Sequence, residues 1–94
     1  MDDDFWFDVG RDERHRVEVG FNRMSGRLKI KVDGTVVQSD RMLFSFRVTR
    51  LYEFTVGQAE QHAVAIEKRR PLLYGGWLPS TYKVFIDGQH VQTF

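Results

Sequence analysis

Apolar and polar residues alternate along most of the chain, and residues 28–37, which read LKIKVDGTVV, show this most clearly. A period of two is typical of a strand that buries one face. The apolar positions before the turn are Leu28, Ile30 and Val32. Asp33 and Gly34 then provide two residues that tolerate positive φ. The pattern predicts a β-hairpin with a type I′ turn.

A two-residue turn also sets which residues face each other across a hairpin. In the first hairpin, Val32 is expected opposite Thr35, and Ile30 opposite Val37. A second Asp-Gly pair lies near the C-terminus, at Asp87-Gly88. The same register there places Val84 opposite Val91.

Other alternating segments predict further strands, over 5–9, 15–21, 42–48, 52–56 and 60–68. No segment longer than ten residues keeps a helical period of 3.6. Short strands joined by local turns predict a single all-β domain over residues 1–94, an antiparallel β-sandwich of about eight short strands joined by hairpins. In the 60–68 strand, Ala63 and Ala65 share one face, which suggests close approach of another surface such as the facing sheet.

Part of this pattern occurs twice. The sequence His-x-Val-x-(Val/Ile) appears at 15–19 and 62–66, and Asp-Gly-x-x-Val-Gln follows at 33–38 and 87–92. One interpretation is a pair of related halves. The other is that any two β-hairpins in a small protein share such alternation.

Composition narrows the class of protein. The chain has 94 residues and no cysteine, which excludes disulfides and thiolate zinc sites. No apolar run approaches the ~20 residues of a transmembrane helix. The acidic N-terminus, Asp2-Asp3-Asp4, differs from the basic start of a secretory signal. These features predict a soluble cytoplasmic protein that does not bind a membrane.

The net charge of the chain is +1, but the charged residues are unevenly distributed along it. Residues 1–13 carry six acids against one base, so the rest of the chain is basic. Five bases are expected on one outward sheet face, namely Arg14, Arg16, Arg27, Lys29 and Lys31. The positions between them are Glu18 and other charged residues rather than Phe or Tyr, on which bases could stack. The pattern favours a solvated face over a nucleic-acid surface.

Signatures of catalysis are missing from the sequence. There is no G-x-S-x-G nucleophile motif, and Gly75-Gly76 follows no strand-to-helix pattern that would cradle phosphate. His15 and His62 could stand on neighbouring strands with Glu60 or Glu18 as a two-histidine and carboxylate metal set. The alternative, which we favour, is hydrogen-bonded histidines at strand starts. We therefore expect no enzyme, no cofactor and no metal.

The segment 68–80 most invites a functional interpretation, because a long connection in a compact domain is often functional. It combines aromatic, aliphatic and arginine side chains of the kinds enriched at protein interfaces. We predict that its contact residues are Arg69, Arg70, Leu72, Leu73, Tyr74 and Trp77. Alternatively, the segment folds back, caps an open end of the sandwich and buries Trp77.

The order of several motifs resembles a domain of the Fas apoptotic inhibitory molecule family. The motifs are Trp6, His15-x-Val17-Glu18, Ser25-Gly26-Arg27, Val32-Asp33-Gly34, Met42-x-Phe44, Phe54-x-Val56-Gly57 and Tyr82-x-Val84-x-Ile86-Asp87-Gly88. The resemblance implies a compact antiparallel β-sandwich without cofactor or known enzymatic chemistry. Animal members have two such domains, act against Fas-triggered cell death and are linked to protection from protein aggregation. The chain departs from the family at 68–80, where the family's loop is short.

These observations predict a non-catalytic protein-interaction module that binds a protein partner or associates with itself. Protection of client proteins from aggregation is a further role that the family resemblance implies. The alternative is a small-ligand-binding β-sandwich. In that case a cleft between the 68–80 segment and the basic sheet face would take an anionic or carbohydrate group.

Overall fold

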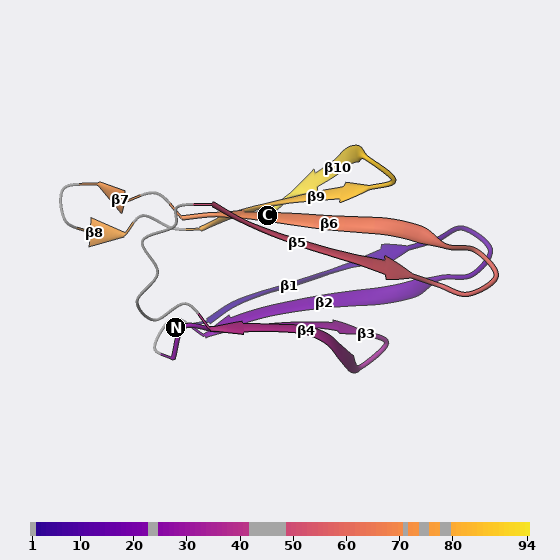
Figure 1. Cartoon of the computed structure of the whole chain (residues 1–94), viewed down its shortest axis with the longest axis horizontal. Coiled ribbons are helices and arrows are strands. Elements are labelled where there is room, and N and C mark those ends of the chain that lie inside the picture. Colours follow the sequence, from indigo (N-terminus) through magenta and orange to yellow (C-terminus); the bar gives the residue numbers. More distant parts are fainter. Residues whose placement is uncertain (1, 23–24, 42–48, 71, 74–75, 78–79) are drawn as a thin grey trace. The chain divides into compact units, whose positions relative to one another are not determined.

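The computed structural model describes residues 2–22, 25–41, 49–70, 72–73, 76–77 and 80–94. Every regular element in these segments is a β-strand. Eight strands form two four-stranded antiparallel sheets (Figure 1), which confirms the predicted all-β, antiparallel sandwich-type fold class. No helix capable of crossing a membrane occurs in the described segments.

The first sheet follows the order of the chain. Its strands are β1 (Asp2–Val9), β2 (His15–Asn22), β3 (Arg27–Val32) and β4 (Thr35–Arg41), in the order β1-β2-β3-β4. Alternate residues of β1, β2 and β3 are buried, as the period of two predicts. The buried side chains are Phe7, Val9, Val17, Val19, Phe21, Leu28 and Ile30.

The second sheet has the order β10-β9-β6-β5. Its strands are β5 (Thr49–Val56), β6 (His62–Arg69), β9 (Thr81–Ile86) and β10 (Gln89–Thr93). Thr49 to Leu51 extend β5 beyond its predicted start at Tyr52. Its buried face includes Tyr52, Val56, Val64, Ile66, Tyr82 and Val84, together with the charged residue Lys68.

The chain divides into two compact units. The first consists of Met1–Ser45 and Val56–His62, and the second of Phe46–Thr55 and Ala63–Phe94. The turn between β5 and β6 therefore belongs to the first unit, where it contacts the turn between β1 and β2. The predicted strand 42–48 lies outside the described residues.

Both Asp-Gly turns have the predicted type I′ conformation. The φ angles are +50° and +84° at Asp33 and Gly34, and +52° and +81° at Asp87 and Gly88. Each aspartate also fixes the neighbouring strand. For example, the Asp33 side chain accepts a 2.9 Å hydrogen bond from the Arg16 N–H, and the Asp33 N–H donates to the Arg16 carbonyl at 2.9 Å.

The predicted register beyond these turns is wrong by one residue. Val32 does face Thr35, but Ile30 faces Gln38 rather than Val37. In the second hairpin Val84 faces Gln92 rather than Val91. A β-bulge in each return strand inserts the extra valine, which leaves it outside the ladder. Val37 and Val91 are accordingly exposed, at 46% and 52%.

The repeated sequence pattern corresponds to a repeated structure. Asp87 contacts Ala63 as Asp33 contacts Arg16, through its side chain at 2.9 Å and its N–H at 2.8 Å. The bulge falls at the same position of both hairpins. The shared Asp-Gly-x-x-Val-Gln sequence therefore encodes a turn, a strand anchor and a bulge, which alternation alone does not require.

Alanine at Gly34 or Gly88 is expected to lower the free energy of unfolding by about 1 kcal/mol, because both glycines have φ near +80°. No atom lies within 4 Å of the Cβ that either substitution adds, so the loss comes from the backbone conformation alone. Urea denaturation of each variant measures it. If both variants are as stable as the wild type, the turn assignment is wrong.

The sequence suggested that Ala63 and Ala65 face another surface such as the facing sheet. In the structure they lie on the opposite, outward face of β6. Val64 and Ile66 take the buried face, at 1% and 0% exposure. Because strand side chains alternate, the two alanines point outward, and Ala63 is exposed.

Candidate functional site

A groove crosses the outward face of the first sheet, and Gly20 lies at its centre. Gly20 is paired with Asp4 on β1 and with Lys29 on β3. Because it has no side chain, the sheet is hollow there between two rows of longer residues. The groove has a volume of ≈ 850 Å³.

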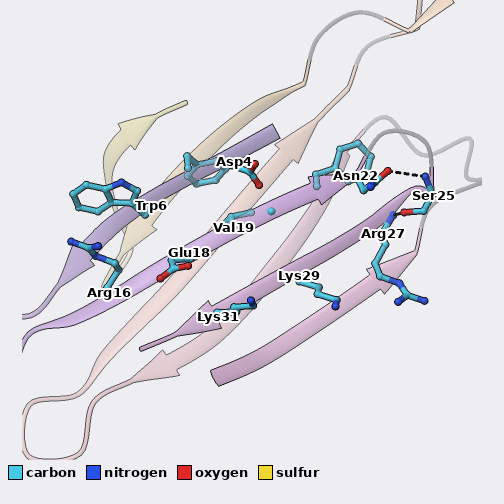
Figure 2. Close-up of a pocket in the computed structure, with 13 residues that line it drawn as sticks. Asp4, Trp6, Arg16, Glu18, Val19, Asn22, Ser25, Arg27, Lys29 and Lys31 are labelled. Carbon is cyan, nitrogen blue, oxygen red and sulfur yellow. Dashed lines mark hydrogen bonds between the residues drawn. The ribbon is translucent and has the colours of Figure 1, made fainter. Parts of the chain in front are cut away.

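The β1 wall of the groove is aromatic and polar (Figure 2). Trp6 is 53% exposed, and the Arg16 guanidinium carbon lies 4.1 Å from the centre of its ring. This cation–π contact orients both side chains over the outward face. The Arg16 Nε also lies 3.9 Å from a carboxylate oxygen of Asp8.

The β3 wall is basic. Lys31 lies opposite Glu18 in the strand register, and Lys29 lies opposite Gly20. Arg27 continues this row toward the turn where the Ser25 N–H donates to the side-chain oxygen of Asn22 at 3.0 Å. Within the described part of the chain, none of these three bases forms an ion pair. These three bases line the groove together with the carboxylates of Asp4 and Glu18.

The groove is long and shallow. A strand rises about 3.3 Å per residue, so β2 from Arg16 to Asn22 lines roughly 20 Å of it. Lys29 and Lys31 are two residues apart on one face, which separates them by about 7 Å along the strand. These dimensions fit a short extended chain with anionic groups at alternate positions.

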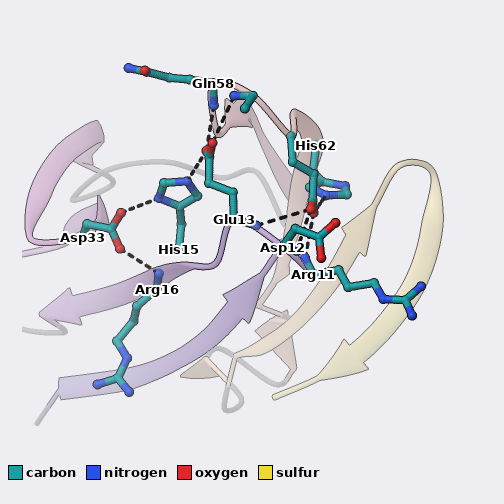
Figure 3. Close-up of polar contacts among 10 residues, drawn as sticks. Arg11, Asp12, Glu13, His15, Arg16, Asp33, Gln58 and His62 are labelled. Atoms are coloured by element: carbon teal, nitrogen blue, oxygen red, sulfur yellow. Dashed lines mark hydrogen bonds and ion pairs between the residues drawn. The ribbon is translucent and has the colours of Figure 1, made fainter.

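A second polar cluster joins the turn between β1 and β2 to the turn between β5 and β6 (Figure 3). The Glu13 carboxylate accepts hydrogen bonds from the N–H groups of Gln58 and Ala59, at 2.8 and 3.0 Å. The Glu60 carboxylate accepts from the N–H groups of Arg11 and Asp12, at 2.7 and 2.8 Å. Each turn thus supplies the carboxylate that satisfies the other turn's backbone.

Histidines complete this cluster. His15 Nε2 lies 2.6 Å from Glu13, and its Nδ1 contacts Asp33 at 2.5 Å. The hydrogen bonds to Asp33 and then Glu13 raise the pKa of His15 above its usual value of 6.5. His62 Nε2 contacts Glu60 in the same way, at 2.5 Å.

The two glutamates are held ionised. The hydrogen bond with His15, followed by those from the Gln58 and Ala59 N–H groups, lowers the pKa of Glu13 to about 2. For Glu60 the pKa also falls to about 2, through His62 first and then the N–H groups of the opposite turn. Such contacts stabilise the charged form of a carboxyl group.

The metal set weighed from the sequence is not assembled as described. His15 and His62 begin strands of different sheets rather than neighbouring strands, and Glu18 points into the groove. Among the described residues no group of three His, Cys, Asp or Glu side chains is arranged to hold a metal ion. The contacts of both histidines match the alternative of hydrogen-bonded residues at strand starts.

The residues predicted as a protein contact are only partly described. Arg69 ends β6, and Arg70 follows it. Leu72–Leu73 forms β7 and pairs with Gly76–Trp77, which forms β8, so the predicted loop contains a short hairpin. Tyr74 lies outside the described residues, as do the side chains of Leu72, Leu73 and Trp77. Whether this segment is exposed or caps the core stays a prediction.

Sequence reasoning missed the two residues that define the groove. It compared aromatic positions only along β2 and β3, whereas Trp6 reaches the basic face from β1, opposite Glu18. Gly20 was assigned to a strand without further interpretation, although a glycine inside a strand often marks close approach of another group. The repeated Gly-x-x-Glu-x-His sequence at 10–15 and 57–62 also signalled the reciprocal cluster.

None of the protein-family models, curated proteins or solved structures compared with the chain matches it.

Proposed function

We propose that the protein is a non-catalytic binding module that holds an acidic, extended segment of a partner protein in the Gly20 groove. The observation that carries this proposal is the glycine itself. Glycine inside a strand costs about 0.5–1 kcal/mol relative to alanine. Its φ is not in the left-handed region, and its added Cβ would meet only a side-chain oxygen of Asp4, at 3.0 Å. The fold accommodates a side chain here once the flexible Asp4 carboxylate shifts slightly, whereas an open groove requires glycine.

The charge on the β3 wall supports an anionic segment. Lys29, Lys31 and Arg27 present three cations along one edge of the groove. An extended peptide with acidic residues at every second position places its carboxylates on one side, at the spacing of these bases. Trp6 on the β1 wall and Arg16 of β2, which contacts its ring, are of the residue types that contribute most to protein interfaces.

An anionic carbohydrate is the second candidate. The exposed ring of Trp6 offers an apolar surface for one face of a sugar, and the β3 bases match carboxylate or sulfate groups. This candidate retains the anionic or carbohydrate ligand predicted from the sequence. It moves the site to the face of a single sheet and away from residues 68–80.

The resemblance to the Fas apoptotic inhibitory molecule family stays a hypothesis, and so do a cytoplasmic location and a role in protecting client proteins. An acidic-segment groove is compatible with such a role, because it recognises a chemical pattern rather than one sequence. The 68–80 segment remains a second proposed contact, centred on Leu73 and Tyr74.

Gly20→Val tests the groove directly. The substitution fills the groove with a side chain that strands favour, so we expect loss of binding with no loss of stability. The probes are a labelled peptide of alternating Glu and Ser, followed by anisotropy, and a sulfated oligosaccharide, followed by tryptophan fluorescence. Binding of the peptide should weaken as salt is raised.

Thr49→Val is the matched control, since it adds a valine at an exposed strand position of the other sheet. It should bind the peptide as the wild type does, whereas a Lys29→Ala/Lys31→Ala double variant should not. Tighter binding of the oligosaccharide than of the peptide would favour the second candidate. If Gly20→Val binds the peptide and the oligosaccharide as the wild type does, both candidate functions of the groove are wrong.

A further inference from the structure

The outward face of the second sheet differs sharply from the groove face of the first. Where β2 has Arg16 and Glu18, the repeat in β6 has Ala63 and Ala65. The alanines form the floor of a depression of ≈ 560 Å³ that is also lined by Leu51 and Phe85. Leu51 is 54% exposed. The depression is a shallow, mainly apolar trough, with Glu53 and Thr55 of β5 also on its lining.

We propose that this trough is the contact surface for a second copy of the same chain, which packs face to face about a two-fold axis. The axis would lie in the interface between the two copies, parallel to β6 and β9 and above the line midway between these strands. These two strands are adjacent in the sheet, so a two-fold rotation places β9 of one copy over β6 of the other (Figure 1). A two-fold contact requires a surface that is complementary to itself.

The strand register makes this surface complementary to itself in side-chain size. Ala65 lies directly opposite Phe85. The two-fold rotation exchanges the two strands, so the Phe85 ring of each copy meets the Ala65 position of the other. The ring already has a fixed neighbour on its far side, because its centre lies 5.4 Å from that of the His90 ring. A large side chain therefore fills the hollow that the alanine leaves, twice per dimer.

The register supplies complementarity in charge as well. Glu67 lies directly opposite Lys83, two residues along from the Ala65 and Phe85 pair and on the same outward face. The same rotation places Lys83 of each copy over Glu67 of the other. Two ion pairs thus flank the apolar contact, and both follow from the one axis that pairs Phe85 with Ala65.

Charge exchange in trans tests the proposal. Sedimentation equilibrium of the wild type should show a reversible dimer. Glu67→Lys gives a face with two lysines and Lys83→Glu a face with two glutamates, so each variant should dimerise at least about tenfold more weakly. An equimolar mixture of the two should form a heterodimer, because their faces are again opposite in charge. Cross-strand effects within one chain cannot produce that rescue.

Ala65→Leu tests the apolar contact, since it closes the hollow and should also leave a monomer. Lys29→Glu is the control: it occupies the same place in the first sheet, so it should impair peptide binding in the groove while the dimer persists. All these positions face outward, and thermal melting should confirm that each variant folds. A monomeric wild type, or single variants that do not recover in the mixture, would overturn the proposal.

Discussion

Replacing Gly10 by alanine is expected to destabilise the protein by about 3 kcal/mol or more. Gly10 has φ of +103°, and a Cβ built on it would lie 1.9 Å from the carbonyl oxygen of Glu13. That oxygen belongs to the backbone of the turn, so it cannot move away without disturbing the Glu13 carboxylate. Gly57 is in the same situation, with φ of +98° and 2.0 Å to the Glu60 carbonyl oxygen.

Equilibrium unfolding in urea measures both variants, with Gly34→Ala as the matched control. Gly34 also has positive φ, but nothing lies within 4 Å of its added Cβ. The difference between the Gly10 and Gly34 variants therefore isolates the steric part of the loss. Equal effects of the two substitutions would show that the turn between β1 and β2 is not built as described.

Acidification is expected to destabilise the protein steeply below pH 4.5. The pKa values of Glu13 and Glu60 fall from 4.5 to about 2 on folding. A carboxyl group whose pKa is lowered by folding contributes stability that is full above its unfolded pKa and is lost as pH falls toward the folded one. Both glutamates lose their contribution over the same range, and the turns that they hold together should open together.

His15 has the opposite dependence. Its pKa is raised above 6.5 by Asp33 and then by Glu13, so its contribution is full below pH 6.5 and is lost as pH rises through the folded pKa. Taken together, these groups predict a maximum of stability between pH 4.5 and 6.5.

The melting temperature as a function of pH measures this profile. Glu60→Gln should lower the melting temperature near neutral pH, because an amide places an N–H₂ group where two backbone N–H groups need acceptors. It should also flatten the fall in melting temperature below pH 4.5, because the carboxyl group that titrates there is gone. Glu53→Gln, at an exposed position of β5, is the control and should leave the acid limb unchanged. An acid limb that is identical in Glu60→Gln and the wild type would contradict the role given to this cluster.

Most of the fold follows from local patterns in the sequence. Alternation identifies the buried face of each strand, as in Val17 and Val19, because burial and the two-residue period are properties of consecutive residues. Asp33-Gly34 identifies the turn for the same reason. The bulge at Val37 could not be predicted this way, since it depends on how many residues one strand places against another.

The groove depends on three strands at once, and this explains why it was missed. Trp6, Gly20 and Lys29 are far apart in the sequence and meet only through the register of β1, β2 and β3. Each has an ordinary explanation when it is considered alone. The reciprocal contacts of Glu13 and Glu60 likewise join two turns, and these two glutamates are 47 positions apart in the sequence.

Mapping by two-dimensional ¹H–¹⁵N correlation spectra, with the Glu-Ser peptide as ligand, tests the central claim most directly. If the Gly20 groove binds acidic segments, the largest shifts should fall on the Gly20 amide, the Trp6 indole and the amides of residues 27–31. Shifts should be absent in Gly20→Val. Shifts confined to residues 68–80, with the Gly20 and Trp6 signals unmoved, would contradict the groove as the binding site.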